Sequence, residues 1–311
     1  MSKEKKFISI VVYCYNVEKY VKNFFDTVIP AFNKKFEKFE IICVNDASTD
    51  NTVPEIKKYF KDNSITQMVQ IMNMSYFQGK EVAINAGRDA TVGDFVYEFE
   101  EMYVDYLGDL VIDVYDKMIL GYDIVVATNG KSGDIFTDIF YKIYNLTSNQ
   151  YDKIGQETFK LISRRAINRI NSMGDYVPYR KSIINSCGLK SYKIQYKAEM
   201  SVKIKRKNNE KRVHSALNYY ILFTDFLEKV TLFMSVFFLV ITVFMGCYLI
   251  YSIFDKNKIE GWLSTMSFMA FGFFGIFLFL AIIMKYLSLI IDITFKQKYY
   301  LVEGVEKINE N

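Results

Sequence analysis

Three polar side chains with the right chemistry to hold a ligand follow one apolar run near the start of the chain. The run, residues 39–46, ends in Asp46 and is followed by Ser48 and Asp50. A short run of this kind predicts a buried parallel strand, and ligands in open α/β sheets bind where such strands end. A carboxylate there could accept hydrogen bonds from a nucleobase or a ribose. Equally, all three could be loop and capping groups for a helix that begins near Thr52.

Apolar runs and helical patterns alternate along the first two thirds of the chain, and this alternation must position those side chains. Strands are expected at residues 7–15, 39–46, 68–72, 95–100, 123–128 and 158–163, with one or two more in 189–204. Helices are expected at about 18–32, 52–61, 79–91, 106–120, 135–147 and 164–172. The fold class is therefore α/β, with a doubly wound, mostly parallel sheet and right-handed crossovers.

Two long stretches near the C-terminus, residues 230–254 and 262–284, carry no charged side chain. Each is long enough to cross a hydrocarbon core of about 30 Å. They predict two transmembrane helices joined by a short turn at 255–261, and the alternative is two helices buried in a soluble core. Residues 213–228 form an amphipathic pattern that predicts a helix in the bilayer interface, or a linker helix packed on protein.

Charge sets the expected orientation of this hairpin. A basic cluster precedes the first stretch; it comprises Lys203, Lys205, Arg206, Lys207, Lys211 and Arg212. The positive-inside rule then leaves the large N-terminal domain in the cytoplasm, with the chain a multi-pass protein of the cytoplasmic (inner) membrane. The expected domains are residues 1–204 (catalytic), 205–228 (basic segment and interfacial helix), 229–292 (hairpin) and 293–311 (cytoplasmic tail).

Composition excludes several classes of function. The formal net charge is only +4, and no nucleic-acid motif accompanies the basic cluster, which beside a membrane favours anionic or phosphate-bearing lipid or serves topology alone. The four cysteines lack C-x-x-C spacing, and a single histidine, His214, cannot build a Cys/His metal site. We expect reduced, inert thiols.

Two motifs in order resemble those of inverting family 2 glycosyltransferases. Residues 11–18, VVYCYNVE, are similar to the family's V-V-P-x-Y-N-E-E opening, and residues 44–52, VNDASTDNT, to its V-N-D-G-S-x-D-x-T. Residues 77–87 and Gly93-Asp94 resemble the next block. With two C-terminal spans, the most similar groups are the bacterial polyprenyl-phosphate glycosyltransferases and the dolichyl-phosphate mannose synthases. The resemblance covers about residues 7–298 and is strongest in the first 95.

The resemblance implies a nucleotide-diphospho-sugar transferase (GT-A) fold and a nucleotide-sugar donor. The residues it assigns to the nucleotide pocket are Tyr15, Asn16, Glu18 and Asp46, with Gly79 and Lys80 nearby. Carboxylates and amides suit the edges of a base and ribose, and a glycine lets the backbone approach closely.

The sequence departs from the family at the fourth strand, where relatives place D-x-D to hold a divalent metal (Mg or Mn). Glu100 takes the first acidic position and Asp105 a later one, but Met102 replaces the second aspartate. A thioether is a poor ligand for these hard cations. Glu98 shares one side of the strand with Glu100 and is an alternative ligand.

A second departure affects the base that relatives use. Residues 156–161 resemble the G-D-F-R-L block, with Thr158 in the aspartate's position and Glu157 beside it as the remaining catalytic candidate. Threonine is no base near neutral pH, but a lipid phosphate is already ionised and needs positioning more than deprotonation. Lys205, Arg206 and Lys207 are expected to contact lipid phosphate, where relatives carry an Arg and G-x-S-K-Y.

These features predict a membrane-bound enzyme that moves a sugar from a nucleotide sugar to a polyprenyl phosphate at the cytoplasmic leaflet, with inversion, for wall, capsule or O-antigen glycan. By resemblance it would form a homotetramer. Met102 and Thr158 motivate the alternative, a catalytically degenerate membrane scaffold or partner subunit. A polymer-elongating synthase is the third hypothesis, but such enzymes usually have more transmembrane spans than the two predicted here.

Overall fold

The structure, a computed structural model, describes residues 3–63, 65–130, 157–172, 188–198, 261–295 and 300–308, with isolated residues between these ranges. The chain divides into two compact units. One comprises residues 1–142, 150–206 and 297–311, and the other comprises 143–149 and 207–296. The candidate site described below lies in the first unit.

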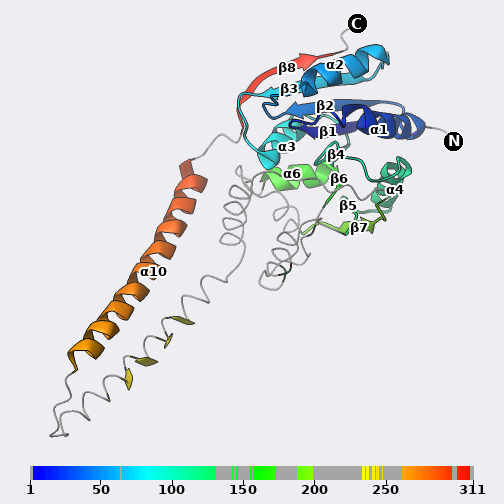
Figure 1. Cartoon of the computed structure of the whole chain (residues 1–311). Helices are drawn as coiled ribbons and strands as arrows, with labels where there is room; N and C mark the ends of the chain where they lie inside the picture. Colours follow the sequence, from blue (N-terminus) through cyan, green and yellow to red (C-terminus); the bar gives the residue numbers. More distant parts are fainter. Residues whose placement is uncertain are drawn as a thin grey trace. The chain divides into compact units, whose positions relative to one another are not determined.

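The first unit is built on a sheet whose eight described strands run in the order β7-β5-β6-β4-β1-β2-β3-β8 (Figure 1). Their bounds are β1 Ile8–Cys14, β2 Phe39–Asn45, β3 Met68–Met74, β4 Phe95–Phe99, β5 Ile124–Thr128, β6 Phe159–Ser163, β7 Ser191–Gln195 and β8 Val302–Lys307. The neighbours β4, β1, β2 and β3 are parallel, as are β5 and β7. β6 is antiparallel to both β4 and β5, and β8 is antiparallel to β3.

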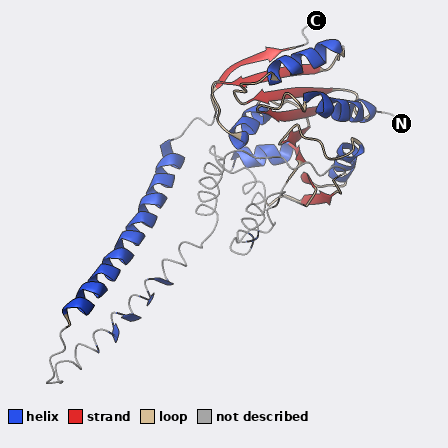
Figure 2. Cartoon of the chain, in the orientation of Figure 1, coloured by secondary structure: helices blue, strands red, loops and turns tan. Residues whose placement is uncertain are grey.

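Helices cover both faces of this sheet (Figures 1 and 2). Their bounds are α1 Val21–Lys35, α2 Thr52–Asp62, α3 Lys80–Asp89, α4 Asp109–Met118 and α6 Arg164–Ser172. Apolar side chains of α1, α2 and α4 pack on one face, and those of α3 and α6 pack on the other. Every residue of β1 and β2 is buried, as expected for central parallel strands covered on both sides.

α3 lies close against the sheet because it carries a glycine at the contact. A Cβ at Gly87 would come within 2.6 Å of side-chain atoms of Val11 and Val44. A larger residue at this position would push α3 away from β1 and β2.

The predicted α/β class, with a mostly parallel sheet, is confirmed. The sequence assigns residues 293–311 to a cytoplasmic tail; the structure shows that this segment contains β8, which pairs with β3 and forms one edge of the sheet. The sequence of β8, VEGVEK, is short and half of its residues are charged, so its own β-propensity does not indicate a strand. Its pairing with β3 stabilises the extended conformation.

The second unit contains α10, Trp262–Phe295, which begins where the second apolar stretch begins. Most of the first apolar stretch, the interfacial helix and the helix expected at 135–147 lie outside the described residues. In the part of the chain that the structure describes, no helix meets the combined length and apolarity needed to cross a membrane. The transmembrane hairpin therefore stays a prediction.

Candidate active site

Four loops with polar side chains meet at one edge of the sheet, because they follow the parallel strands β1, β2, β3 and β4. Cys14 pairs with Asn45 and Asn45 with Asn73, so these strands end at the same level. This is the edge at which open α/β sheets bind ligands. All the residues predicted for the nucleotide lie in these loops or at the start of α3.

Asp46 lies at the end of β2 and is fully buried. Its carboxylate accepts hydrogen bonds from the backbone N–H groups of Gln78 and Gly79, at 2.8 and 2.9 Å, and from the hydroxyl of Tyr13 at 3.0 Å. Burial, followed by the negative charge of Asp46, raises the pKa of Tyr13 well above its usual value, so this hydroxyl remains a neutral donor. Asp46 thus organises the loop after β3, and in this state it presents no open edge to a ligand.

Asn16 and Glu18 join the loop after β1 to the loop after β2. Asn16 Oδ1 accepts a hydrogen bond from the backbone N–H of Thr49 at 2.8 Å, and Glu18 Oε2 accepts one from Asn51 at 3.1 Å. Asn16 has a φ of 52° and Ala47 a φ of 54°. Both loops therefore adopt left-handed conformations that are uncommon for residues other than glycine, and such residues cluster at functional sites.

An aromatic pair borders these loops. The rings of Tyr15 and Phe77 lie 4.6 Å apart between centroids, tilted by 49°, and remain 36% and 41% exposed. Exposed aromatic faces beside hydrogen-bonding groups can stack on a nucleobase. The sequence predicts Tyr15 for this pocket but misses Phe77, although Phe77 opens the block that resembles the family's third motif.

Gly79 and Lys80 start α3 in the same loop cluster. Gly79 has a φ of 94°, which disfavours any side chain there, and Lys80 is the first helical residue. The Lys80 ammonium lies 2.9 Å from Glu101 and 3.7 Å from Glu100. A helix N-terminus with a lysine in its first turn is a favourable place for a phosphate group.

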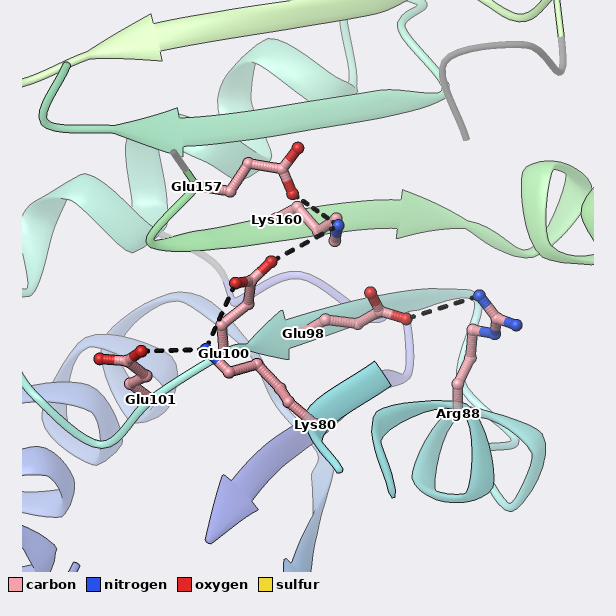
Figure 3. A network of polar contacts seen from close by, with 7 residues as sticks. All are labelled: Lys80, Arg88, Glu98, Glu100, Glu101, Glu157 and Lys160. Carbon is pink, nitrogen blue, oxygen red and sulfur yellow. Dashed lines mark hydrogen bonds and ion pairs between the residues drawn. The ribbon is translucent and has the colours of Figure 1, made fainter. Parts of the chain in front are cut away.

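A network of charged side chains fills the end of β4 on the face covered by α3 (Figure 3). Lys160, which β6 presents opposite β4, is 1% exposed and donates a hydrogen bond to Glu157 at 2.6 Å. Its ammonium lies 4.0 Å from Glu100. The sequence does not single out Lys160, although a charged residue inside an apolar strand is a signal of a buried partner.

Glu98, the alternative metal ligand, lies deeper along the same face of β4. It is fully buried, and its carboxylate lies 3.9 Å from the guanidinium of Arg88 in α3 (Figure 3). Burial lowers the pKa of Arg88. Glu98 and Glu100 share one side of the strand as expected, but they face different cations, Glu98 facing Arg88 and Glu100 facing the two lysines.

Asp105 belongs to a separate hydrogen-bonded cluster with Asn129, Thr158 and Tyr196. Its Oδ1 accepts a hydrogen bond from the hydroxyl of Tyr196 at 2.6 Å, and its Oδ2 accepts one from Asn129 at 2.8 Å. The hydroxyls of Tyr196 and Thr158 lie 2.7 Å apart. Burial and Asp105 raise the pKa of Tyr196, so it too is a neutral donor. Thr158, which stands where relatives carry a base, is thus tied to Asp105 through Tyr196.

Met102 does not face the acidic side chains. It is fully buried in the apolar cluster that lies on the α1, α2 and α4 face of the sheet. The interpretation of Met102 as the occupant of a metal-facing position is therefore wrong, because an apolar core surrounds its side chain. Within the described ranges, no three His, Cys, Asp or Glu side chains come close enough together to hold a metal ion.

The residues expected to contact lipid phosphate, Lys205, Arg206 and Lys207, lie outside the described residues. The structure therefore brings together the six nucleotide candidates, and Glu100 and Glu157 join them through two lysines. Asp105 lies in its own hydrogen-bonded cluster.

The proteins to which this chain is similar in sequence include glycosyltransferases. Residues 9–101 match the model of glycosyl transferase family 2, which confirms the resemblance over that stretch. The chain is 28% identical over 182 residues to an uncharacterized glycosyltransferase of Synechocystis, an alignment that covers 57% of this chain and 56% of that protein. It is 26% identical over 269 residues to the bactoprenol glucosyl transferase of Shigella phage SfX, covering 83% and 86%.

A solved structure shares the fold. The mannosyltransferase PcManGT from Pyrobaculum calidifontis, in complex with GDP-Man and Mn²⁺, aligns with a TM-score of 0.51 and 15% identity, covering 73% of this chain and 65% of that one. At this identity the likeness concerns the fold alone. The chain spans a little over half the length of its Synechocystis relative, 56%.

Proposed function

We propose that this chain, whose residues 9–101 match the model of glycosyl transferase family 2, transfers a sugar from a nucleotide-sugar donor to a polyprenyl phosphate. The observation that carries the proposal is the meeting of the Tyr15/Phe77 pair, the Asp46-centred loops and Lys80 at one edge of a parallel sheet. Aromatic faces, backbone amides and a lysine at a helix start match the base, ribose and diphosphate of such a donor.

The chemistry is a single displacement with inversion. An ionised oxygen of the acceptor phosphate attacks the anomeric carbon, the new C–O bond forms, and the bond to the donor diphosphate breaks, so that the nucleoside diphosphate leaves with the electron pair. No proton need be removed from an ionised phosphate, which makes the threonine at position 158 compatible with turnover. The protein contributes position and positive charge.

Glu157 fits a structural part in this scheme better than that of a base. Its carboxylate accepts a hydrogen bond from the Lys160 ammonium at 2.6 Å. An ion-paired carboxylate is a weak proton acceptor, and the acceptor phosphate does not require one.

The acceptor and the location complete the proposal. Residues 230–254 and 262–284 are uncharged, and α10 exposes large apolar side chains such as Phe271, Phe274 and Met284, which suit a lipid surrounding. The bactoprenol glucosyl transferase of Shigella phage SfX is named for a lipid of this chemical class. We place the enzyme in a bacterial cytoplasmic membrane, with residues 1–228 in the cytoplasm and Lys205, Arg206 and Lys207 near lipid phosphate.

The test is a transfer assay with the full chain in detergent. It is incubated with labelled UDP-, GDP- and CDP-sugars and undecaprenyl phosphate, and label is followed into the lipid fraction. We expect transfer with one donor and its loss in Phe77→Ala, while Tyr76→Ala, an exposed aromatic neighbour, serves as the control. Nucleotide binding without transfer of any sugar would instead support the degenerate scaffold, which Thr158 still motivates.

A further inference from the structure

We propose that Lys80 supplies positive charge to the donor diphosphate in place of a divalent cation, and that Lys160 makes this possible by offsetting part of the negative charge of Glu100 and Glu157. The proposal rests on the function proposed above and deepens it. It follows from how the carboxylates at the end of β4 are occupied.

Glu100, the first predicted metal ligand, already faces two ammonium groups. Its Oε1 lies 4.0 Å from Lys160 and its Oε2 lies 3.7 Å from Lys80 (Figure 3). The Glu100 side chain is 10% exposed and that of Lys160 is 1% exposed, so solvent screens their interaction little. A divalent cation bound to Glu100 would lie within a few ångströms of both ammonium groups and be repelled by them.

The remaining candidates supply no replacement ligands. Both carboxylate oxygens of Asp105 accept hydrogen bonds, from Tyr196 and from Asn129. Met102 points into the apolar core, and Glu98 lies beside Arg88. Mg²⁺ and Mn²⁺ favour several hard oxygen ligands, and this donor set does not fit either ion.

Lys80 has the position and freedom to take over the charge. It is the first residue of α3, where the backbone N–H groups of the first turn also favour an anion, and its side chain is 29% exposed. Its contact at 2.9 Å is with Glu101, which is itself 31% exposed. Exchanging that partner for a diphosphate oxygen keeps the ammonium paired.

Lys160 is a positioning residue in this arrangement. It is too buried to meet the donor itself, but it pairs with Glu157 at 2.6 Å and faces Glu100. Without its charge, Glu100, which also faces Lys80, and Glu157 would repel an incoming diphosphate and would be available to a metal ion. The two lysines are therefore expected to have opposite effects: loss of Lys80 weakens nucleotide binding, whereas loss of Lys160 creates a metal site.

The experiment uses the full chain in detergent, with UDP and GDP as probes and Mn²⁺ followed by electron paramagnetic resonance. We expect the parent to bind the nucleotide equally well in EDTA and in Mn²⁺, and to immobilise no Mn²⁺ with or without nucleotide. Lys80→Met should weaken nucleotide binding about tenfold or more, whereas Lys80→Arg should keep most of it. Lys58→Met, at an exposed position of α2, is the matched control.

Lys160→Met should gain an Mn²⁺ site that Glu100→Gln removes, and its nucleotide binding should become metal-dependent. Thermal unfolding of each variant reports whether it is folded. If Lys160→Met does not fold, the parent and the Lys80 variants still decide the matter. The proposal is overturned if the parent immobilises Mn²⁺ through Glu100, or if its nucleotide binding requires the metal.

The outcomes separate this proposal from the proposed function. Nucleotide binding that ignores metal, without transfer of any sugar, overturns the function and keeps the lysine proposal. Transfer that requires Mn²⁺ keeps the function and overturns the lysine proposal. Absence of UDP and GDP binding in every condition overturns both.

Discussion

Two acidic side chains at the same edge of the sheet, Asp46 after β2 and Glu100 after β4, are stabilised in different ways. Asp46 is held by two backbone N–H groups and a tyrosine hydroxyl, all neutral donors. Glu100 is held by the ammonium groups of two lysines. The contacts of Asp46 fix the conformation of the loop after β3, whereas those of Glu100 offset its negative charge.

This difference determines which part of the site can rearrange when a ligand binds. Backbone amides around Asp46 come from one loop, so the carboxylate and the loop must move together. Lys80 can leave Glu100 and Glu101 individually, because each contact is between long side chains. We therefore expect the Asp46 end to set the geometry of the nucleoside and the Glu100 end to respond to the diphosphate.

The largest effect should come from Met102→Asp, which asks whether the end of β4 can be converted into a conventional acidic site. Met102 is fully buried among apolar side chains, so the new carboxylate would lie in the core without a partner. We expect the free energy of unfolding to fall by about 3–5 kcal/mol in denaturant titrations. Met102→Leu should cost under about 1.5 kcal/mol. A stable Met102→Asp protein that binds Mn²⁺ would contradict this placement.

Asp46→Asn should have the next largest effect. Both oxygens of the Asp46 carboxylate accept an N–H group, one from Gln78 and one from Gly79. In the variant, the NH₂ group of the asparagine replaces one of these oxygens, so two hydrogen-bond donors face each other. We expect a loss of about 1–3 kcal/mol in unfolding free energy, together with weaker UDP or GDP binding by calorimetry. Asp26→Asn, at an exposed carboxylate that accepts one bond from Tyr59, is the control. Equal losses in both variants would contradict the assignment of Asp46 to the nucleotide site.

Gln78→Ala tests whether the C-terminal segment supports the Asp46 loop. The Gln78 side chain donates to the Leu301 carbonyl at 2.7 Å and accepts from the Leu301 N–H at 2.9 Å. We expect a loss of about 1 kcal/mol and faster hydrogen exchange in residues 300–308 by mass spectrometry. Gln70→Ala, on β3, should leave that exchange unchanged. Unchanged exchange in Gln78→Ala would mean that other contacts, such as the pairing of β8 with β3, hold this segment.

The smallest effect concerns pH. Burial, followed by Asp89, raises the pKa of Tyr300 to about 12, and its hydroxyl donates to Asp89 at 3.1 Å. Since the folded-state pKa exceeds the unfolded value of about 10, this stabilisation is complete below pH 10 and is lost as the pH rises through 12. Solvent screening keeps it under about 1 kcal/mol. Unfolding of the parent and Tyr300→Phe should therefore differ at pH 9 and converge near pH 12, and a constant difference would contradict the assignment.

The sequence could predict the elements whose signal is local. Strands such as β1 and β2 are continuous apolar runs, and the loops after them carry motif residues that the structure gathers at one edge. It could not predict the partner of Glu100, because Lys160 reaches it only through the antiparallel pairing of β6 with β4, in which Glu98 lies opposite Lys160. The same holds for the Asp105, Tyr196 and Thr158 cluster, which joins three segments far apart in the chain.

The position of β8 has a consequence for how the protein is made. β3, Met68–Met74, is synthesised long before β8, Val302–Lys307, the strand that covers its edge. At a translation rate of roughly 5–20 residues per second, the ribosome needs on the order of ten seconds or more to travel from β3 to β8. For that time the nascent sheet presents an unpaired edge, which favours contact with chaperones or with other chains. Synthesis of β8, and not of the motifs at the candidate site, is then the event that completes the sheet.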